Sequence, residues 1–179
     1  MPPPSKCTQL NKTFVALDTE TTGFQEEGGS EELIQIGLVK ENGAHFSRFF
    51  LPNGSFSASA IETHGLSMEI LKTKGAKKFT SSDAEDILEF LGDNSLIIAH
   101  NYKFDWTVLL QAFKQVGIWL PKFRYVCTQT LAANLQLPQS LEDLCTHFGI
   151  EYTHKHDALE DARVTIEIWK KLKDALEAL

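Results

Sequence analysis

The chain has 179 residues, of which 42% are hydrophobic, and a formal net charge of −7. This length fits one domain with a substantial core, and the composition is that of an ordinary globular protein. A membrane span needs about 20 consecutive apolar residues, and the sequence contains no such run. The start, Met1-Pro2-Pro3-Pro4, lacks the apolar centre of a secretory signal peptide.

Cysteine content and charge narrow the class of protein further. Cys7, Cys127 and Cys145 are odd in number and widely spaced, which argues against a disulfide framework or a zinc–thiolate site and indicates a reducing cytosol. A protein that binds long nucleic-acid duplexes usually has a basic face, so the negative net charge disfavours a duplex-binding protein. A protein that takes only the end of a strand needs few phosphate contacts, and simple solubility explains the charge equally well.

The predicted elements describe an α/β domain. Residues 1–11 are rich in proline and polar residues, which predicts a flexible tail before a single domain at 12–179. Asn42-Gly43 marks a hairpin turn between two strands, and a capping box of Ser82 and Glu85 starts a helix. Three strands followed by alternating strands and helices predict a mixed sheet. Strands are expected at 12–18, 33–40, 44–51, 96–99 and 124–127, and helices at 58–64, 67–73, 82–91, 102–116, 129–135, 141–148 and 158–178.

The segment Asp18-Thr19-Glu20 stands where the first apolar run ends. Residues i and i+2 of a strand point to the same face, so the Asp18 and Glu20 carboxylates are expected to converge. Converging carboxylates repel each other unless a cation lies between them, and ligands that are all oxygen suit a hard cation such as Mg²⁺ or Mn²⁺. The strand end therefore predicts half of a metal site.

A third carboxylate, Asp105, lies on the helix expected at 102–116. It precedes Val108 and Leu109 by three and four residues, so it shares their apolar stripe, where an unpaired carboxylate is costly. The alternative is an N-terminal aspartate that the helix dipole stabilises. Asn101, four residues earlier, fits the cap of the same helix.

The last expected helix has a fourth carboxylate in its first turn. Asp157 and Glu160 form a capping-box pattern, which places Asp161 beside the apolar face of the helix. His156 precedes the cap on a short loop that can direct its ring toward Asp161; an exposed loop histidine is the simpler alternative. A zinc site of His154 and His156 is disfavoured, because the pair lacks cysteine and the helical His-Glu-x-x-His pattern.

Electrostatics sets the condition under which these carboxylates can meet. Two like charges about 4 Å apart repel by about 4 kcal/mol at an effective dielectric constant of about 20. Three such contacts cost on the order of 10 kcal/mol, comparable to the stability of a whole domain. The groups must therefore be protonated or bind cations, and two divalent ions balance four negative charges. The candidate ligands are Asp18, Glu20, Asp105 and Asp161.

The order and spacing of these residues resemble the three motifs of the DEDDh 3′→5′ exonuclease family. The resemblance covers about residues 12–172 and is strongest to the exonuclease domain of the epsilon (proofreading) subunits of bacterial DNA polymerase III. The motifs are Asp18-x-Glu20, Asn101-x-x-x-Asp105 and His156-x-x-x-x-Asp161, and the supporting segments are Leu33–Val39, Thr63-His64-Gly65-Leu66 and Ser140–Cys145.

The resemblance implies a ribonuclease H-like fold with a central mixed five-stranded sheet. It also implies that the four carboxylates bind two Mg²⁺ or Mn²⁺ ions, with Asp18 bridging them. Glu20 and His156 are the expected catalytic residues, Glu20 as a ligand of one ion and His156 as the base that takes the proton of the attacking water. Histidine suits that role because its ordinary pKa lies near neutrality. The expected product is a nucleoside 5′-monophosphate from a 3′ end of single-stranded or frayed DNA.

The resemblance also implies a set of substrate contacts. The backbone and hydroxyls near Thr21 and Thr22 are expected to meet the terminal nucleotide, with His64 and Leu66 near its base or sugar. Phe104 is a candidate stacking surface, and core packing is the alternative for Leu66 and Phe104. The implied substrate-binding residues are Thr21, Thr22, Gly23, His64, Leu66, Asn101 and Phe104.

Two features depart from the family pattern, and a basic cluster is a separate candidate for phosphate contact. Epsilon subunits have a C-terminal extension that binds the polymerase, whereas the last expected helix ends near Leu179, so the chain is expected either to act alone or to contact a polymerase through another surface. The loop at 25–32 adds four glutamates beside the expected site, which disfavours long nucleic acid unless the loop is a solvated insertion. A basic cluster is expected to be a solvated loop rather than a phosphate-steering site; it consists of Lys72, Lys74, Lys77 and Lys78.

Two other functions remain as alternatives. One is an RNA-directed 3′→5′ exoribonuclease similar to ribonuclease T or oligoribonuclease. The other is a non-catalytic nucleic-acid-binding or polymerase-accessory module on the same fold. The presence of all five family residues disfavours the non-catalytic module.

Overall fold

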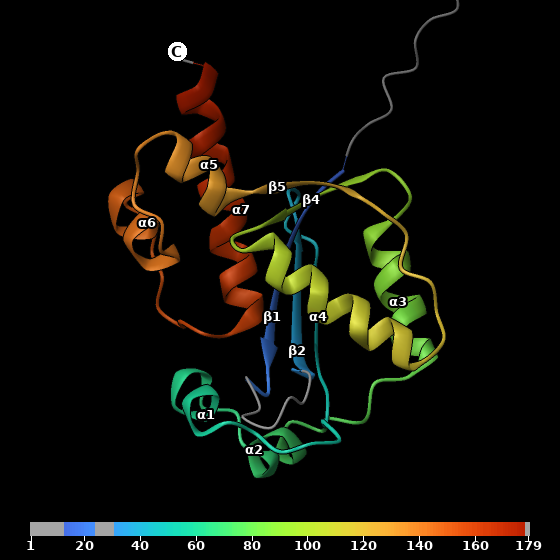
Figure 1. Ribbon diagram of the computed structural model, residues 1–179. Coiled ribbons are helices and arrows are strands. Elements are labelled where there is room, and N and C mark those ends of the chain that lie inside the picture. The colour runs from blue at the N-terminus through green and yellow to red at the C-terminus, as the bar shows by residue number, and fades with distance from the viewer. Residues whose placement is uncertain (1–12, 24–30, 178–179) are drawn as a thin grey trace, which may run out of the picture.

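A mixed five-stranded sheet forms the centre of the computed structural model, which describes residues 13–23 and 31–177 (Figure 1). The strand order is β3-β2-β1-β4-β5. β1 pairs antiparallel with β2 and parallel with β4, and β5 extends the sheet parallel to β4, which confirms the predicted mixed sheet. The strands are β1 (Thr13–Thr21), β2 (Leu33–Lys40), β3 (His45–Phe49), β4 (Ser95–Ala99) and β5 (Arg124–Cys127). The expected tail at 1–11 and residues 25–30 of the expected acidic loop lie outside the described residues.

β1 is longer than the sequence predicted. The expected strand ended at residue 18, whereas β1 continues to Thr21 and includes Asp18 and Glu20. Antiparallel pairing with β2 supplies hydrogen-bond partners for this polar part, and the register shifts between Glu20 and Thr21, where Thr21 pairs with Leu33. The strand end that carries the carboxylates is thus held by a neighbouring strand rather than by its own apolar pattern.

The helices follow the predicted ranges closely, but the predicted cap of α3 is wrong. Thr80 caps α3, because its hydroxyl accepts from the Asp83 N–H and the Asp83 carboxylate accepts from the Thr80 N–H. The predicted capping pair, Ser82 and Glu85, lies inside the helix. Arg48 of β3 donates to Asp83 at 2.7 Å and so favours Asp83 as the cap partner, a contact that local sequence does not reveal. The helices are α1 (Ala58–His64), α2 (Met68–Thr73), α3 (Ser81–Leu91), α4 (Tyr102–Gln115), α5 (Thr128–Asn134), α6 (Leu141–Phe148) and α7 (Ala158–Glu177).

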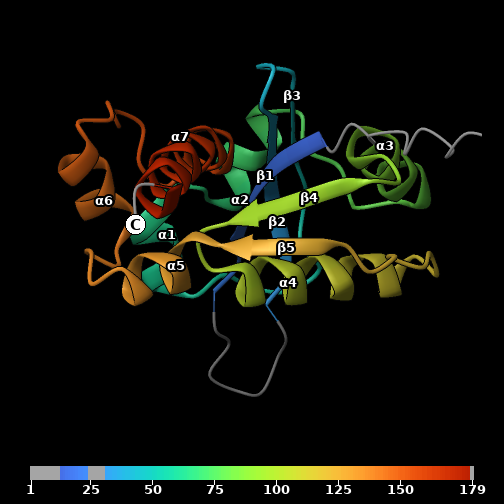
Figure 2. The same ribbon diagram turned by 90° about the horizontal axis from the view of Figure 1, so that it is seen from above.

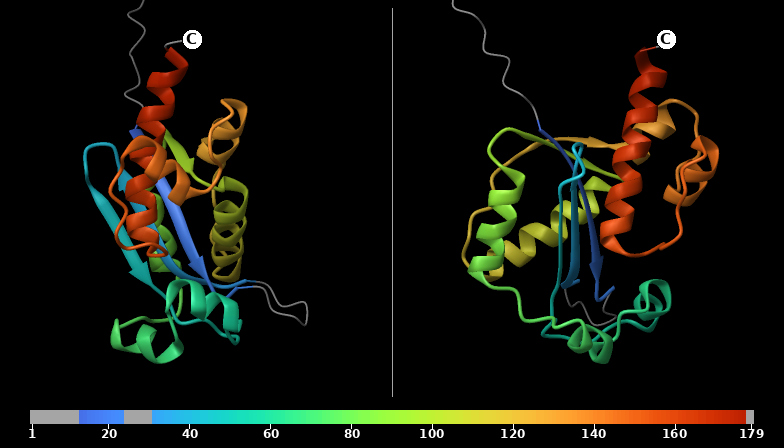
Figure 3. Two further views of the ribbon diagram at one scale, coloured as in Figure 1. Left: turned by 90° about the vertical axis from the view of Figure 1, so that its left-hand side faces the viewer. Right: turned by 180° about the vertical axis from the view of Figure 1, so that it is seen from behind.

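The sheet lies between two layers of helices (Figures 2 and 3). Leu17 of β1 packs in the core shared with α3 and α4, whereas Ala16 packs against Ala162 and Ile166 of α7. Because side chains alternate along a strand, Asp18 and Glu20 share the α7 face with Ala16. α1 and α2 lie beyond the end of the sheet at which β1 ends (Figure 1). None of the helices in the described part of the chain is long and apolar enough to cross a membrane.

A glycine in β2 sets the position of the N-terminus of α7. A Cβ atom at Gly37 would lie 2.1 Å from the Ala158 carbonyl oxygen, so the helix can approach the strand this closely only over glycine. Gln35 of the same strand donates to the Asp157 carboxylate at 3.1 Å and accepts from the Ala158 N–H at 3.4 Å. These contacts fix the first turn of α7, which contains Asp161, against the sheet.

Candidate metal and catalytic site

Three carboxylates from two elements converge at the end of β1. Asp18 and Glu20 project from β1 and Asp161 from the first turn of α7, and one oxygen atom of each lies within 4.8 Å of the others. This group is the one set of three or more histidine, cysteine or acidic side chains in the described residues that has a metal-binding arrangement. His154 and His156 are not part of it, so the geometry gives no support to a zinc site of these histidines.

Asp105 approaches the same strand end from the opposite face of the sheet. It lies in the first turn of α4 and is buried, with 3% of its surface exposed. The Thr19 hydroxyl, between Asp18 and Glu20, donates to Asp105 Oδ1 at 2.8 Å. Asp105 therefore stays outside the group of three but lies close enough for its charge to raise the pKa values of Asp18 and Glu20.

Full ionisation of all four carboxylates is unfavourable, because they are close together and at least partly buried. Burial, followed by repulsion from Asp105 and Asp161, raises the pKa of Asp18 well above its usual range. Burial and repulsion from Asp161 and Asp105 raise the pKa of Glu20 to about 8. Burial also raises the pKa of Asp105 to about 7 and that of Asp161 to about 6. At neutral pH the cluster must therefore retain protons or bind cations, and its oxygen-only donors suit a hard divalent cation.

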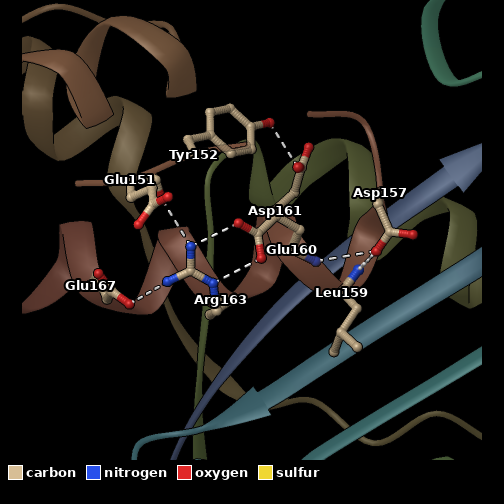
Figure 4. Close-up of polar contacts among 8 residues, drawn as sticks. All are labelled: Glu151, Tyr152, Asp157, Leu159, Glu160, Asp161, Arg163 and Glu167. Atoms are coloured by element: carbon tan, nitrogen blue, oxygen red, sulfur yellow. Dashed lines mark hydrogen bonds and ion pairs between the residues drawn. The ribbon is translucent and has the colours of Figure 1, made fainter. Parts of the chain in front are cut away.

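A hydrogen-bond network orients Asp161 (Figure 4). The Tyr152 hydroxyl donates to Asp161 Oδ1 at 2.7 Å, and this bond opposes the rise in the pKa of Asp161. Arg163 holds the chain just before Tyr152, because its guanidinium donates to the Glu151 carbonyl oxygen at 2.8 Å. The same guanidinium binds the Glu160 carboxylate. Sequence reasoning missed Tyr152, since a tyrosine in a loop gives no signal of its partner.

His156 lines a groove next to the first turn of α7, and none of the four carboxylates lines this groove. Its side chain is exposed, and its φ of 61° is in the left-handed region that residues other than glycine seldom adopt. The groove has a volume of about 750 Å³ and is lined by Gln35 of β2 and by residues of two further segments. One segment contains His64 and Leu66, and the other runs from Thr153 to Glu160.

His64 is held in one tautomer. Its Nδ1 atom accepts from the Leu66 N–H at 3.0 Å, so the proton is on Nε2, which donates to the Thr21 carbonyl oxygen at 3.1 Å. Burial is the main cause that lowers the pKa of His64, and the neutral ring therefore suits both bonds. His64 connects α1 to the end of β1, and both of its nitrogen atoms have partners.

The threonines after Glu20 use their hydroxyls to shape the strand end. Thr21 Oγ1 accepts from the Gly23 N–H at 3.1 Å, and Thr22 Oγ1 accepts from the Glu32 N–H at 3.0 Å. Gly23 has a φ of 75°, and a Cβ atom there would lie 2.3 Å from Ser57 Oγ. Both threonines are buried, so their side chains support the turn.

The remaining expected contact residues differ in exposure. Leu66 is buried in a small core but also lines the groove, and Phe104 is partly buried against the main core. Asn101 occupies the N-cap position of α4, as the sequence predicted, but its exposed side chain makes no capping hydrogen bond. Its ψ of 66° departs from the extended geometry that side-chain caps require.

The lysine cluster and the described end of the acidic loop have contacts of their own. All four lysines of the cluster are exposed, as expected of a solvated segment, and Lys74 also lines the groove. Glu32 accepts hydrogen bonds from the Asn53 and Gly54 N–H groups at 2.8 and 2.6 Å. This glutamate is thus a structural tie between two loops.

Comparison with known proteins assigns a family to this arrangement. The model of the exonuclease family RNase_T matches residues 15–169, which include all four carboxylates and His156. The chain belongs to this exonuclease family. The DNA polymerase III subunit epsilon of Rickettsia prowazekii is 32% identical over 171 residues, which are 88% of this chain and 72% of that protein. The PolC-type DNA polymerase III of Thermotoga petrophila is 32% identical over 177 residues, which are 94% of this chain but 12% of that protein.

Solved structures confirm the ribonuclease H-like fold of this exonuclease chain. Escherichia coli exonuclease I in complex with a dT13 oligonucleotide has a TM-score of 0.77 at 19% identity, over 90% of this chain and 41% of that one. The nuclease domain of 3′hExo, a DEDDh family member bound to rAMP, has a TM-score of 0.74 at 17% identity, over 93% and 94%. The family resemblance that the three motifs indicated is thus confirmed.

Proposed function

We propose that the chain is a metal-dependent 3′→5′ exonuclease that hydrolyses the terminal phosphodiester bond of single-stranded or frayed DNA and releases nucleoside 5′-monophosphates. The convergence of Asp18, Glu20 and Asp161 beside the exposed His156 carries the proposal, because it combines a ligand set with a base at the edge of a groove. Membership of the exonuclease family supports it.

The four carboxylates fit a pair of divalent cations. Their raised pKa values come from burial and mutual repulsion, which bound cations would relieve. When bound, Mg²⁺ or Mn²⁺ supplies an activated water and stabilises negative charge on the scissile phosphate. The residues that would hold the two ions, with Asp18 shared between them, are Asp18, Glu20, Asp105 and Asp161.

His156 is the better candidate for the base of the two histidines at the groove. Both nitrogen atoms of His64 are used by backbone partners, so its ring cannot take a proton without losing a hydrogen bond. The His156 ring is exposed and would accept the proton of the attacking water. His64 instead holds the backbone of Thr21 in place.

The groove would hold the terminal nucleotide. Leu66 and His64 line it together with residues of the segment 153–160, which directly precedes Asp161, so a base or sugar held there would lie close to that carboxylate. Because the hydroxyls of Thr21 and Thr22 are used within the turn, their contribution would be the shape of the strand end and its backbone. Asn101 and Phe104 at the start of α4 would complete the substrate contacts.

DNA is the proposed substrate because the relatives of about one-third identity are DNA polymerase III proteins. The epsilon-type relatives point to proofreading or repair, in the cytoplasm and with a polymerase contact. The RNA-directed alternative predicts equal or faster cleavage of RNA. The non-catalytic alternative predicts tight binding of 3′ ends without turnover in the presence of metal.

One experiment separates these functions. Single-stranded DNA and RNA of matched sequence, labelled at the 5′ end, are digested with Mg²⁺, with Mn²⁺ and with a chelator. We expect a ladder shortened from the 3′ end on DNA, 5′-monophosphates as product, and no reaction with the chelator. Asp18→Ala should abolish cleavage, whereas Asp174→Ala, an exposed aspartate on α7, should not. Retained cleavage in purified Asp18→Ala protein contradicts the proposal.

A further inference from the structure

The exposed side of α4 and the adjacent strand β5 has a charge opposite to that of the whole chain. Residues 102–125 contain four basic residues and one acidic residue, Asp105, which is buried in the carboxylate site, whereas the chain has a net charge of −7. The four basic side chains are exposed, and none of them forms an ion pair with another described residue. They are Lys103, Lys114, Lys122 and Arg124.

The helical period places two of these lysines on one stripe of α4. Lys103, Thr107, Leu110 and Lys114 follow the spacing i, i+4, i+7 and i+11, and all four are exposed. Leu110 has 43% of its surface exposed, so the stripe is partly apolar between its two charges. The 14 residues of α4 extend over about 21 Å, a span that reaches several nucleotides.

A column of stacked aromatic rings lies beside this stripe. Tyr125 of β5 stacks on Tyr102 of α4 with ring centroids 3.7 Å apart and planes at 2°, and Tyr102 stacks in turn on Trp106 at 5.5 Å. Tyr102 is buried, whereas Tyr125 is 55% exposed on the edge strand of the sheet. The outer ring of the column is thus held in place and open to solvent, so stacking a base on it costs little side-chain entropy.

We propose that this α4–β5 surface (Tyr125, Lys103 and Lys114) binds the single strand that leads to the 3′ end. Exposed aromatic rings beside basic side chains are the recurring components of sequence-independent single-strand sites, in which rings stack on bases and cations contact phosphates. Tyr102 and Asp105 share the first turn of α4, so the column starts next to the carboxylate site, and β5 lies along α4 (Figure 2). The inference rests on the proposed exonuclease function.

The test compares a long substrate with a minimal one. KM and kcat are measured for a 15-residue oligothymidylate and for the p-nitrophenyl ester of thymidine 5′-monophosphate, which occupies the carboxylate site alone. Tyr125→Ala should raise KM for the oligonucleotide about tenfold and leave both constants for the ester unchanged. Tyr125→Phe, which retains the stacking ring, should restore the KM of the original protein.

The lysines give a second, independent readout. The double variant Lys103→Ser/Lys114→Ser should weaken oligonucleotide binding and reduce the slope of log affinity against log salt by about 1.4, because each lost phosphate contact contributes about 0.7 for a single strand. A control with the same charge change uses Lys170 and Lys171, which are exposed on α7. The double control variant should leave the slope unchanged.

The outcomes separate this proposal from the proposed function. An oligonucleotide KM that stays unchanged in folded Tyr125→Ala and lysine variants overturns the surface assignment and leaves this face to a protein partner. If Tyr125→Ala fails to fold, the salt dependence of binding by the Lys103→Ser/Lys114→Ser variant tests the surface assignment by itself. If the original protein hydrolyses neither substrate, the proposed function fails, and fluorescence anisotropy with the labelled 15-mer still shows whether the variants bind it more weakly.

Discussion

Removing metal should make the stability of this protein depend on pH through Glu20. Burial and the neighbouring Asp161 and Asp105 raise its pKa to about 8, compared with a usual value of 4.5. Between these two pH values the folded protein keeps a proton that the unfolded chain has released, so the free energy of unfolding falls as the pH rises. The fall attributable to this one carboxylate amounts to about 4 kcal/mol at pH 8, a large part of the stability of an ordinary domain.

Glu20→Gln tests this effect, because it removes the titrating group, nearly preserves its shape and also removes one of the charges that raise the pKa of Asp18. In a chelator, urea unfolding should give a higher free energy of unfolding for the variant at pH 8, and the difference should close as the pH falls toward 4.5. His64 and His100, whose pKa values are lowered by burial, oppose the trend, but they are present in both proteins and cancel in the difference.

Added Mg²⁺ should narrow the difference at pH 8, because the original protein has the full ligand set. A metal at 100 times its dissociation constant stabilises the folded state by about 2.7 kcal/mol, and Glu20→Gln should gain less. A difference between the two proteins that does not vary with pH, or that is larger at pH 5 than at pH 8, would refute the electrostatic reasoning.

Three further predictions concern the groups around the carboxylates. Gly37→Ala should force α7 away from β2 by about 1 Å, which costs about 1–3 kcal/mol of stability and lowers kcat about 100-fold. The control is Gly43→Ala at a turn glycine with φ of 86°, where a Cβ atom would meet no neighbouring group within 4 Å; it should lose about 1 kcal/mol of stability with kcat unchanged. Equal losses of kcat in both variants would contradict the close-approach argument. Tyr152→Phe should weaken metal binding about tenfold in calorimetry, because it removes the hydrogen bond that orients Asp161, and an unchanged affinity would show that the hydroxyl has no positioning role. His156→Ala should slow turnover by about 10²–10⁴-fold while calorimetry finds metal affinity nearly intact; a collapse of that affinity would identify His156 as a ligand instead of a base.

Local patterns predicted most element positions well. β2 at 33–40, α1 at 58–64 and β5 at 124–127 agree with the predicted ranges, because turn signals and apolar periodicity act within a few residues. The predicted boundaries are wrong where a residue far away in the sequence determines where the element starts or ends. β1 extends to Thr21 through its pairing with β2, and α3 begins at the cap that Arg48 of β3 supports.

The candidate site shows the same division. The pairing of Asp18 with Glu20 follows from strand alternation, which is a local property of the backbone. The hydrogen bond from Thr19 to Asp105 depends on α4 covering the opposite face of the sheet. The hydrogen bond from Tyr152 to Asp161 depends on the conformation of the loop before α7. No spacing in the sequence encodes either contact.

The sequence by itself determined the chemistry that is available: oxygen ligands at one strand end, further acids at the starts of two helices and a histidine before the last one. Only the tertiary structure decided which of them meet, because that depends on crossings between elements far apart in the chain. Gly37 lets α7 approach close enough to bring Asp161 to Asp18. Packing likewise turned Tyr125 and the lysines of α4 into one exposed surface, since helix and edge strand come together only in the folded chain.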